Sequence, residues 1–371
     1  GEVDGACAIL HSLLNRNVVS WSALITAASA HPTTFSCIYQ QMQHECVTPD
    51  RVAMVAFLNV CRHTRAIKQG ELIHRQIIKR GFDTDLVVRG ALIDMYMKCD
   101  RLDDAQDVFD EVSSPTIVLW GEMISGYSKH GKDHHALELY SKMQHAGIAP
   151  DMFLFSCLLK ACGRIGALEQ GKMLQAEMMR NQVKPDVVIG NAMISMYMRC
   201  GDLTEACRIF NELPYRDSTS WGFMISIHAQ YGDGKLAIQC FNDMQKHGIK
   251  PNEMVFTRLL SSCSRTGEGR EGKFQLNAMN ERQYLGPSNK HFTCMLELLG
   301  SIGDHEAAKN VLQTMPFTPN IINWMSVLTA CKRHGNTELG QHCIQQINQL
   351  GSHLSLENVL LPNMYTKSCP S

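Results

Sequence analysis

The chain has 371 residues, of which 44% are hydrophobic and 19% are charged. This composition is too apolar for a disordered chain and is sufficient for an extensive core. With 35 Lys and Arg against 36 Asp and Glu, the net charge of −1 excludes recognition of a nucleic acid through overall positive charge. A nucleic-acid partner would have to be bound by a local surface.

Cysteine usage and hydropathy narrow the class of protein further. The sequence has 15 cysteines, none spaced as C-x-x-C, and several lie in apolar helical patterns, such as Cys61, Cys162 and Cys263. This is typical of reduced, buried thiols in an intracellular protein. No run approaches the roughly 18–20 apolar residues of a membrane span, so we expect no membrane partner. The chain begins at Gly1 without a Met or a targeting segment, and we expect it to be part of a longer protein.

The sequence repeats itself with a period of about 101 residues. Its only four tryptophans are spaced 99, 101 and 103 residues apart (Trp21, Trp120, Trp221, Trp324). Three cysteines are 101 residues apart, as are three methionines (Met42, Met143, Met244). Such self-similarity indicates a repeat architecture.

Each long period divides into three repeats, two longer ones and a shorter one, as in 117–151, 152–186 and 187–217. In chain order, a partial repeat over 1–17 is followed by complete ones and by two terminal segments. The complete repeats are 18–50, 51–85, 86–116, 117–151, 152–186, 187–217, 218–252, 253–288 and 289–320, and the terminal segments are 321–355 and 356–371.

Every repeat has the pattern of two helices. In 117–151, apolar residues recur at helical spacing, Gly131 interrupts the pattern, and a second apolar stripe ends at Gly147 and Pro150. A single helical hairpin cannot bury both of its apolar faces, whereas stacked hairpins can. The pattern therefore predicts an all-α fold, an α-solenoid of helix-turn-helix repeats. The tryptophans lie within the apolar stripes, so we expect them in the core.

Sequence motifs of catalytic or metal sites are incomplete. Residues 166–173 nearly match the phosphate-binding loop G-x-x-x-x-G-K-[ST], but Met173 replaces the hydroxyl that would bind Mg²⁺. The same stretch recurs in degraded form at 65–71 and 267–273, so the repeat explains it. There is no zinc-finger spacing and no deaminase signature. We expect no catalytic residues, no metal site and no cofactor, and we do not expect an enzyme.

Several stretches resemble pentatricopeptide repeats of the plant P-L-S type. Three stretches resemble the first helix of a P repeat: VVSWSALI, IVLWGEMISGYSKHG and STSWGFMISIHAQYGD. The stretch FSCLLKACGRIGALEQGK resembles an L repeat, and VVIGNAMISMYMRCGDLTEACRIFNELPYRD resembles an S repeat. The segment INWMSVLTACKRHGNTELGQHC resembles the first extension (E) motif of that family, and ENVLLPNMY resembles the start of the second. By this resemblance, 1–17 is a partial S repeat and 18–320 contains repeats in P, L, S order. The segment 321–355 is the E1 motif, and 356–371 is a truncated E2 motif. The sequence contains no stretch that resembles the DYW deaminase domain of the family.

The resemblance implies a right-handed superhelix that binds single-stranded RNA in a sequence-specific way, in a mitochondrion or chloroplast of a plant. Members with extension motifs are site-recognition factors in organellar RNA modification, C-to-U editing, or processing. The implied partners are single-stranded RNA and a deaminase or other editing protein supplied in trans.

The resemblance also implies which residues read bases, namely the fifth and the last of each repeat, with one base per repeat. Three pairs are informative: Ser22 with Asp50 for guanine, Asn191 with Asp217 for uracil, and Thr293 with Asn320 for adenine. The weaker readers are Asp151 and Asn252, whose fifth-residue partners Gly121 and Gly222 have no side chain, and the pair Ser156 with Asp186. The second residue flanks the bases, which gives Val19, Val118, Val188 and Thr219.

Each polar base-reading candidate has an alternative explanation as a helix cap, because Ser, Thr, Asn and Asp are the preferred N-cap residues. The function has alternatives as well. A tetratricopeptide-like scaffold for protein partners would have repeats of one uniform length, without the Pro-Asp ends. A degenerate, non-functional copy of an RNA-binding protein would explain the glycines at the fifth position.

Overall fold

The computed structural model describes residues 47–182, 184–272, 274–275 and 288–350, with isolated positions between 21 and 45. Ser22, Val19, the partial repeat 1–17 and the segment 356–371 lie outside the described residues. The described part is α-helical, with turns between the helices and no strand. None of its helices is long and apolar enough to cross a bilayer.

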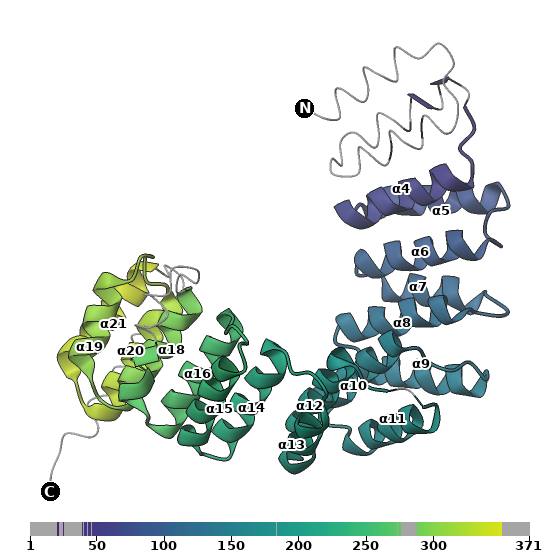
Figure 1. Cartoon of the computed structure of the whole chain (residues 1–371). Coiled ribbons are helices and arrows are strands. Elements are labelled where there is room, and N and C mark those ends of the chain that lie inside the picture. Colours follow the sequence, from purple (N-terminus) through teal and green to yellow (C-terminus); the bar gives the residue numbers. More distant parts are fainter. Residues whose placement is uncertain are drawn as a thin grey trace, which may run out of the picture. The chain divides into compact units, whose positions relative to one another are not determined.

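Helices alternate between a first and a second member of a hairpin (Figure 1). The first helices are α4 (Arg51–Thr64), α6 (Leu86–Lys98), α8 (Ile117–Lys129), α10 (Met152–Ile165), α12 (Val187–Cys200), α14 (Ser218–Gln230), α16 (Glu253–Thr266), α18 (Asn289–Ser301) and α20 (Ile321–His334). The second helices are α5 (Ile67–Lys79), α7 (Leu102–Asp110), α9 (Asp133–His145), α11 (Leu168–Arg180), α13 (Leu203–Glu212), α15 (Gly234–Lys246), α19 (His305–Thr314) and α21 (Thr337–Leu350).

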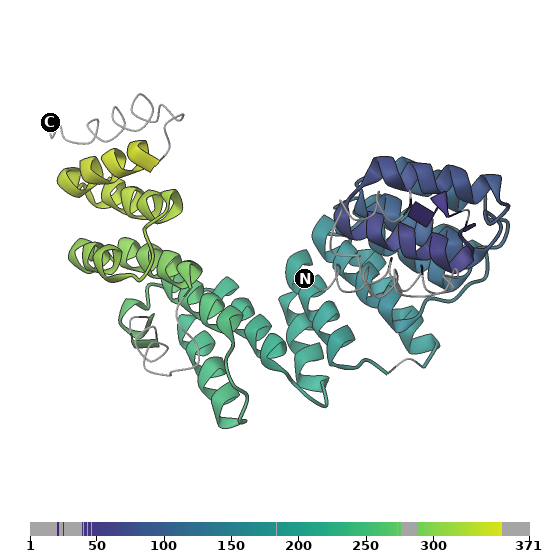
Figure 2. The same cartoon turned by 90° about the horizontal axis from the view of Figure 1, so that it is seen from above.

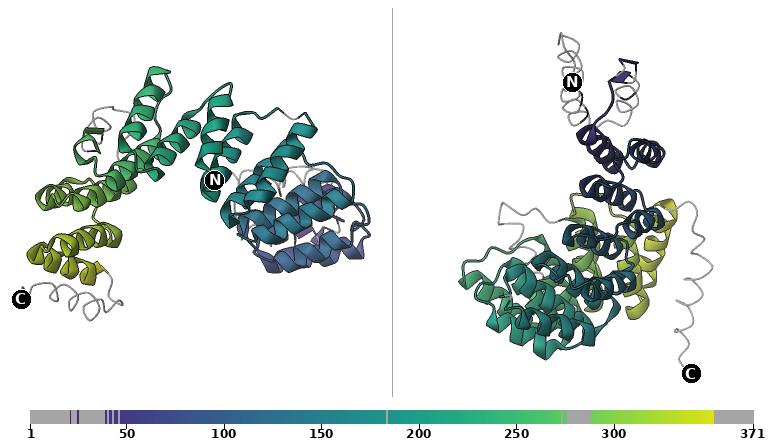
Figure 3. Two further views of the ribbon diagram at one scale, coloured as in Figure 1. Left: turned by 90° about the horizontal axis from the view of Figure 1, so that it is seen from below. Right: turned by 90° about the vertical axis from the view of Figure 1, so that its right-hand side faces the viewer.

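The chain divides into two compact bodies, an N-terminal half over Gly1–Lys184 and a C-terminal half over Pro185–Ser371. In the N-terminal half, α4, α6, α8 and α10 pack on one another in sequence, and each packs on its own second helix (Figures 2 and 3). In the C-terminal half, α12, α14, α16, α18 and α20 also pack on one another in sequence, and α12, α14, α18 and α20 each pack on their own second helix. The stacked helical hairpins predicted from the repeats are thus confirmed within each half, while the handedness of a superhelix stays a prediction.

The helix boundaries follow from residues that recur once per repeat. An Asp or Asn stands before most first helices and accepts a hydrogen bond from the first turn, as Asp50 does from the Ala53 N–H at 2.8 Å. At the other end, a left-handed residue closes the helix: Gly166 has φ of 74° and Arg65, at the equivalent place, has 51°. Glycine adopts this conformation without steric cost.

The predicted core position of the tryptophans is confirmed, since all four side chains are buried. Trp120 contacts Phe109 edge to face, with ring centroids 4.8 Å apart, and Trp221 contacts Phe210 in the same way at 5.2 Å. Each pair joins a first helix to the second helix of the preceding repeat. Cys61, Cys162 and Cys263 are also buried, and the described cysteines form no disulfide.

Asp151 provides a test of the capping role. Its side chain accepts from the Leu154 N–H at 2.8 Å at the start of α10. We expect Asp151→Ala to lower the free energy of unfolding by about 1 kcal/mol, because the N–H loses its partner. Asp151→Asn keeps the acceptor and should leave stability nearly unchanged, as measured by urea unfolding. Equal losses in both variants would show that the cap is not the cause.

Candidate nucleic-acid interface

One apolar side chain stands exposed at the second position of nearly every described repeat. Most apolar residues of these first helices point into the core, so an exception that recurs at one position needs a reason. The exposed fractions lie between 56 and 62%, and the residues are Val52, Val87, Val118 and Phe153 in the N-terminal half and Val188, Met254 and Ile322 in the C-terminal half. We call these residues the second-position stripe.

The stripe differs in part from the residues expected from the sequence. Val118 and Val188 are exposed, while Thr219 is only half-buried and Lys290 brings a charge to the same position. Phe153 was missed, although it is the one aromatic member of the stripe and stands at the same position in its repeat. The repeat register alone was a sufficient signal for it.

The predicted pair Asn191 and Asp217 is in direct contact. The Asn191 Nδ2 donates to Asp217 Oδ1 at 3.0 Å, which joins the first helix of one repeat to the residue that caps the next. Ser220 completes the group: its backbone N–H donates to Asp217 at 2.8 Å, and its hydroxyl lies 2.7 Å from Asn191 Oδ1. The amide of Asn191 keeps a second N–H that can donate to a ligand.

The pKa of Asp217 reflects this arrangement. Burial by itself raises the pKa, but the hydrogen bonds from the Ser220 backbone and the Asn191 amide outweigh burial, and the pKa falls below its ordinary value. Asp217 is therefore an ionised acceptor at neutral pH. The hydrogen bonds hold the pair in place. Both side chains are only half-buried, so the pair is not sealed in the core.

The second predicted pair, Thr293 and Asn320, is linked through a third residue. Asn320 and Asn323 exchange two backbone-to-side-chain hydrogen bonds at 2.9 and 3.0 Å, which cap α20. It is Asn323 that contacts Thr293, donating from Nδ2 to its hydroxyl at 2.9 Å. The sequence reading missed both Asn323 and Ser220, which occupy the third position of the following repeat. Whether the two pairs read bases stays a prediction.

The last-residue candidates Asp50, Asp151, Asp186 and Asn252 serve as caps of first helices. Their side chains accept from the helix at 2.8 to 3.0 Å. Ser156, in the N-terminal half, has only 5% of its surface exposed, which leaves its hydroxyl little contact with a ligand. A cap still has free acceptor capacity, so capping by itself does not exclude base contact.

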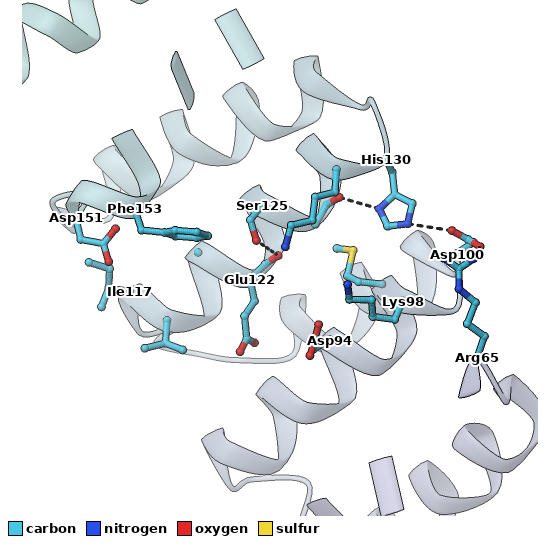
Figure 4. Close-up of a pocket in the computed structure, with 15 residues that line it drawn as sticks. Arg65, Asp94, Lys98, Asp100, Ile117, Glu122, Ser125, His130, Asp151 and Phe153 are labelled. Carbon is cyan, nitrogen blue, oxygen red and sulfur yellow. Dashed lines mark hydrogen bonds and ion pairs between the residues drawn. The ribbon is translucent and has the colours of Figure 1, made fainter. Parts of the chain in front are cut away.

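A cavity of about 570 Å³ opens between α6, α8 and the start of α10 in the N-terminal half (Figure 4). Phe153 and Asp151 lie at one end (Figure 4), and Val118 also lines the cavity. An added Cβ on Gly121, which also lines the cavity, would meet only Leu154, at 4.0 Å, so a side chain would fit there.

The other end of the cavity is charged. His130 lies 3.0 Å from Asp100, and Arg65 lies 3.2 Å from the same carboxylate. Lys98 and Lys129 also line the cavity and form no ion pair among the described residues. Each is the thirteenth residue of its repeat, at the end of the first helix.

Basic residues recur at this thirteenth position in both halves. They are Lys98, Lys129, Arg164, Arg199, Arg265 and Arg333. Arg164 differs from the others because it is held by the buried carboxylate of Asp133. In the C-terminal half, a cavity of about 780 Å³ is lined by Arg265, Arg333 and the stripe residue Ile322. Both cavities thus combine an exposed apolar side chain with basic groups.

Comparison with protein-family models gives two matches. The model described as the PPR repeat family matches residues 115–164 and 216–265, and the model described as the PPR repeat matches 87–114 and 191–217.

Similar curated proteins come from Arabidopsis thaliana. One pentatricopeptide repeat-containing protein is 32% identical over 98% of this chain and 50% of its own length. Another, named as mitochondrial, is 32% identical over 94% of this chain and 56% of its own length. A third, named as chloroplastic, is 30% identical over 99% of this chain and 46% of its own length. The chain spans about half the length of the curated relatives it matches.

The fold is also similar to solved structures of the pentatricopeptide repeat protein PPR10. The complex of PPR10 with an 18-nucleotide psaJ RNA element has a TM-score of 0.81 at 19% identity, over 95% of this chain and 54% of that one. A structure of PPR10 from maize has a TM-score of 0.54 at 15% identity, over 98% of this chain and 64% of that one. At these identities the likeness shows the fold.

Proposed function

We propose that this chain, which belongs to the pentatricopeptide-repeat proteins, binds single-stranded RNA with one base assigned to each repeat. The observation that supports this most is the second-position stripe. Each member stands one turn before the fifth residue of its repeat and next to the cap that ends the preceding one. An unpaired base needs an apolar surface for its planes and polar groups for its edge, and these repeats offer both at a fixed spacing.

In this proposal, the bases lie between successive members of the stripe. Stacking on an aromatic side chain contributes about 1–3 kcal/mol per base, so Phe153 should contribute more than the valines. The pair Asn191 and Asp217 presents donors and an acceptor to one base edge. The basic residues at the thirteenth position, other than Arg164, are placed to contact phosphates, which gives a local positive surface on a chain of net charge −1.

The biological role that we propose is site recognition in organellar RNA modification, C-to-U editing, or processing. Support comes from the mitochondrial and chloroplastic names among the relatives and from the extension-like segment 321–355. The deaminase would come from a part of the protein beyond this sequence or from a separate protein. A mitochondrion or a chloroplast is the location that fits this role.

The test is selection from a randomised single-stranded RNA pool with the wild type and Asn191→Ser. Wild type should enrich a motif that contains uracil at one position, and Asn191→Ser should change that position toward guanine by about tenfold, the effect of one changed base contact. Binding should weaken as salt rises, because phosphate contacts release counterions.

Asn211→Ser is the matched control, since Asn211 is exposed on the second helix α13. It should leave the motif unchanged. A wild-type protein that retains RNA without enriching any motif, or that retains none at either salt concentration, would contradict the proposal and favour a protein-binding scaffold.

A further inference from the structure

Two repeats have a charged side chain lying over a glycine where the fifth side chain would be. If Gly90 had a Cβ, it would stand 3.1 Å from Oε2 of Glu122, and a Cβ on Gly222 would stand 3.3 Å from Nη1 of Arg258. Glu122 and Arg258 have the same place in the sequence pattern, because each is the sixth residue of the repeat that follows the glycine. The two cases belong to different halves of the chain and carry opposite charges.

The same two atoms are buried without a hydrogen-bond partner. Oε2 of Glu122 and Nη1 of Arg258 are both shielded from solvent, and neither makes a hydrogen bond. A buried polar atom without a partner is costly, and the cost is larger for a charged group. An unpartnered atom at this position in two separate repeats points to a ligand that supplies the missing partner.

The surroundings of each group show how it is held. Glu122 lines the cavity of the N-terminal half and is directed toward Asp94 (Figure 4). Burial, and then the negative charge of Asp94, raise the pKa of Glu122 to about 7, with Arg62 acting in the opposite direction. The Arg258 guanidinium lies over the ring of Phe223, 4.3 Å from its centroid, and burial lowers its pKa.

A third repeat provides an internal comparison. Gly121 is also a fifth residue, but the sixth residue of the next repeat is Cys157, which does not approach it. Leu154, at 4.0 Å, is the nearest side chain to a Cβ at that position. The position of the missing side chain is therefore occupied in two repeats and open in the third.

We propose that Glu122 and Arg258 act as substitute base readers for the repeats 86–116 and 218–252, in place of the absent fifth side chains. This inference rests on the proposed RNA-binding function. Glu122 would select guanine, because a carboxylate accepts from two donors and guanine presents its N1–H and N2–H side by side. Rotation about the last bond of the Glu side chain, which has broad preferences, turns both oxygens toward such an edge.

Arg258 would select cytosine. The guanidinium donates two parallel N–H bonds, and cytosine presents adjacent acceptors at N3 and O2. Asn252, the last residue of the same repeat, carries an amide oxygen that can accept from the amino group at N4 of cytosine. The two contacts therefore agree on one base.

The experiment is selection from the randomised RNA pool with wild type, Glu122→Gln and Gly121→Asn. Glutamine has nearly the same shape as glutamate but presents one donor and one acceptor, so it no longer matches the two adjacent donors N1–H and N2–H of guanine. Glu122→Gln should lower the enrichment of guanine at one position by about tenfold relative to the other three bases. Gly121→Asn marks the register: beside Asp151 it should create a preference for uracil at the adjacent position.

Arg258→Lys is the corresponding change in the other half. Lysine keeps the charge and removes the paired donors, so the enrichment of cytosine should fall by about tenfold at the position assigned to the repeat 218–252. Suppose that Gly121→Asn introduces uracil at its position. If the wild type then selects no base at the adjacent position, or if Glu122→Gln leaves the selected base there unchanged, the substitute-reader inference is wrong, while the proposed RNA binding stands. If no variant binds the pool, the proposed function itself fails.

Discussion

Replacing Arg164 with alanine is expected to lower the free energy of unfolding by about 3 kcal/mol. The Arg164 guanidinium donates to both oxygens of Asp133, at 2.8 Å from Nε and 2.6 Å from Nη2, and only 3% of the Asp133 side chain is exposed. It also donates to the Ser128 backbone carbonyl at 3.2 Å. Removal of one partner of a buried ion pair leaves the other charge uncompensated, which costs about 3–5 kcal/mol. We take the lower end because 36% of the Arg164 side chain is exposed.

The measurement is urea unfolding followed by circular dichroism, with Arg199→Ala as the control. Arg199 holds the same position in the next repeat but is exposed and forms no ion pair among the described residues. Its removal should change stability by about 0.5 kcal/mol or less. Similar losses for the two variants would mean that the pair between repeats is not what stabilises the N-terminal half.

Glu122→Gln is expected to stabilise the protein at pH 8 by about 2 kcal/mol and to have almost no effect at pH 4.5. The pKa of Glu122 is about 7 in the folded protein against an ordinary value of 4.5. Below pH 4.5 the group is neutral in both the folded and the unfolded chain. Between 4.5 and 7 the unfolded chain loses the proton first, so stability falls as pH rises, and the full cost is present above pH 7.

Glutamine avoids this cost because it is neutral at every pH. A shift of this size corresponds to roughly 3 kcal/mol, and we expect somewhat less because the side chain is only partly buried. Denaturant unfolding at pH 4.5, 6 and 8 measures the trend. Glu138→Gln, at an exposed position of α9 without an ion pair among the described residues, should show no such trend. A constant difference between Glu122→Gln and wild type at all three pH values would sink this interpretation.

Repetition made most of the fold predictable. Each helix type recurs once per repeat, so a weak local signal, such as the apolar stripe around Trp120 or the terminal Asp151, is confirmed by its counterparts one period away. The prediction that the tryptophans lie in the core is confirmed for this reason. The register also contained Phe153 and the rest of the second-position stripe, which a search for polar side chains does not find.

Contacts between neighbouring repeats were not predictable in the same way. Asn323 rather than Asn320 contacts Thr293, and Ser220 joins Asn191 to Asp217. Arg164 was one of several basic residues at the same position, and nothing local distinguished it from Arg199. Such contacts depend on which side chain of the next hairpin lies within about 3 Å, and a shift of one rotamer changes the partner.

The sequence by itself determined the class of fold and the register of the hairpins, because these are properties of a local pattern that repeats. The assignment of base reading to the fifth and last positions follows from the family resemblance and stays a prediction. Tertiary structure alone decided which side chain of the neighbouring repeat lies beside each glycine at a fifth position. Packing of one hairpin on the next places the Glu122 and Arg258 side chains over Gly90 and Gly222 and leaves Gly121 open. Burial and the charge of Asp94 then set the protonation of Glu122. These effects come from side chains of the neighbouring repeat, whose directions the pattern of a single repeat does not contain.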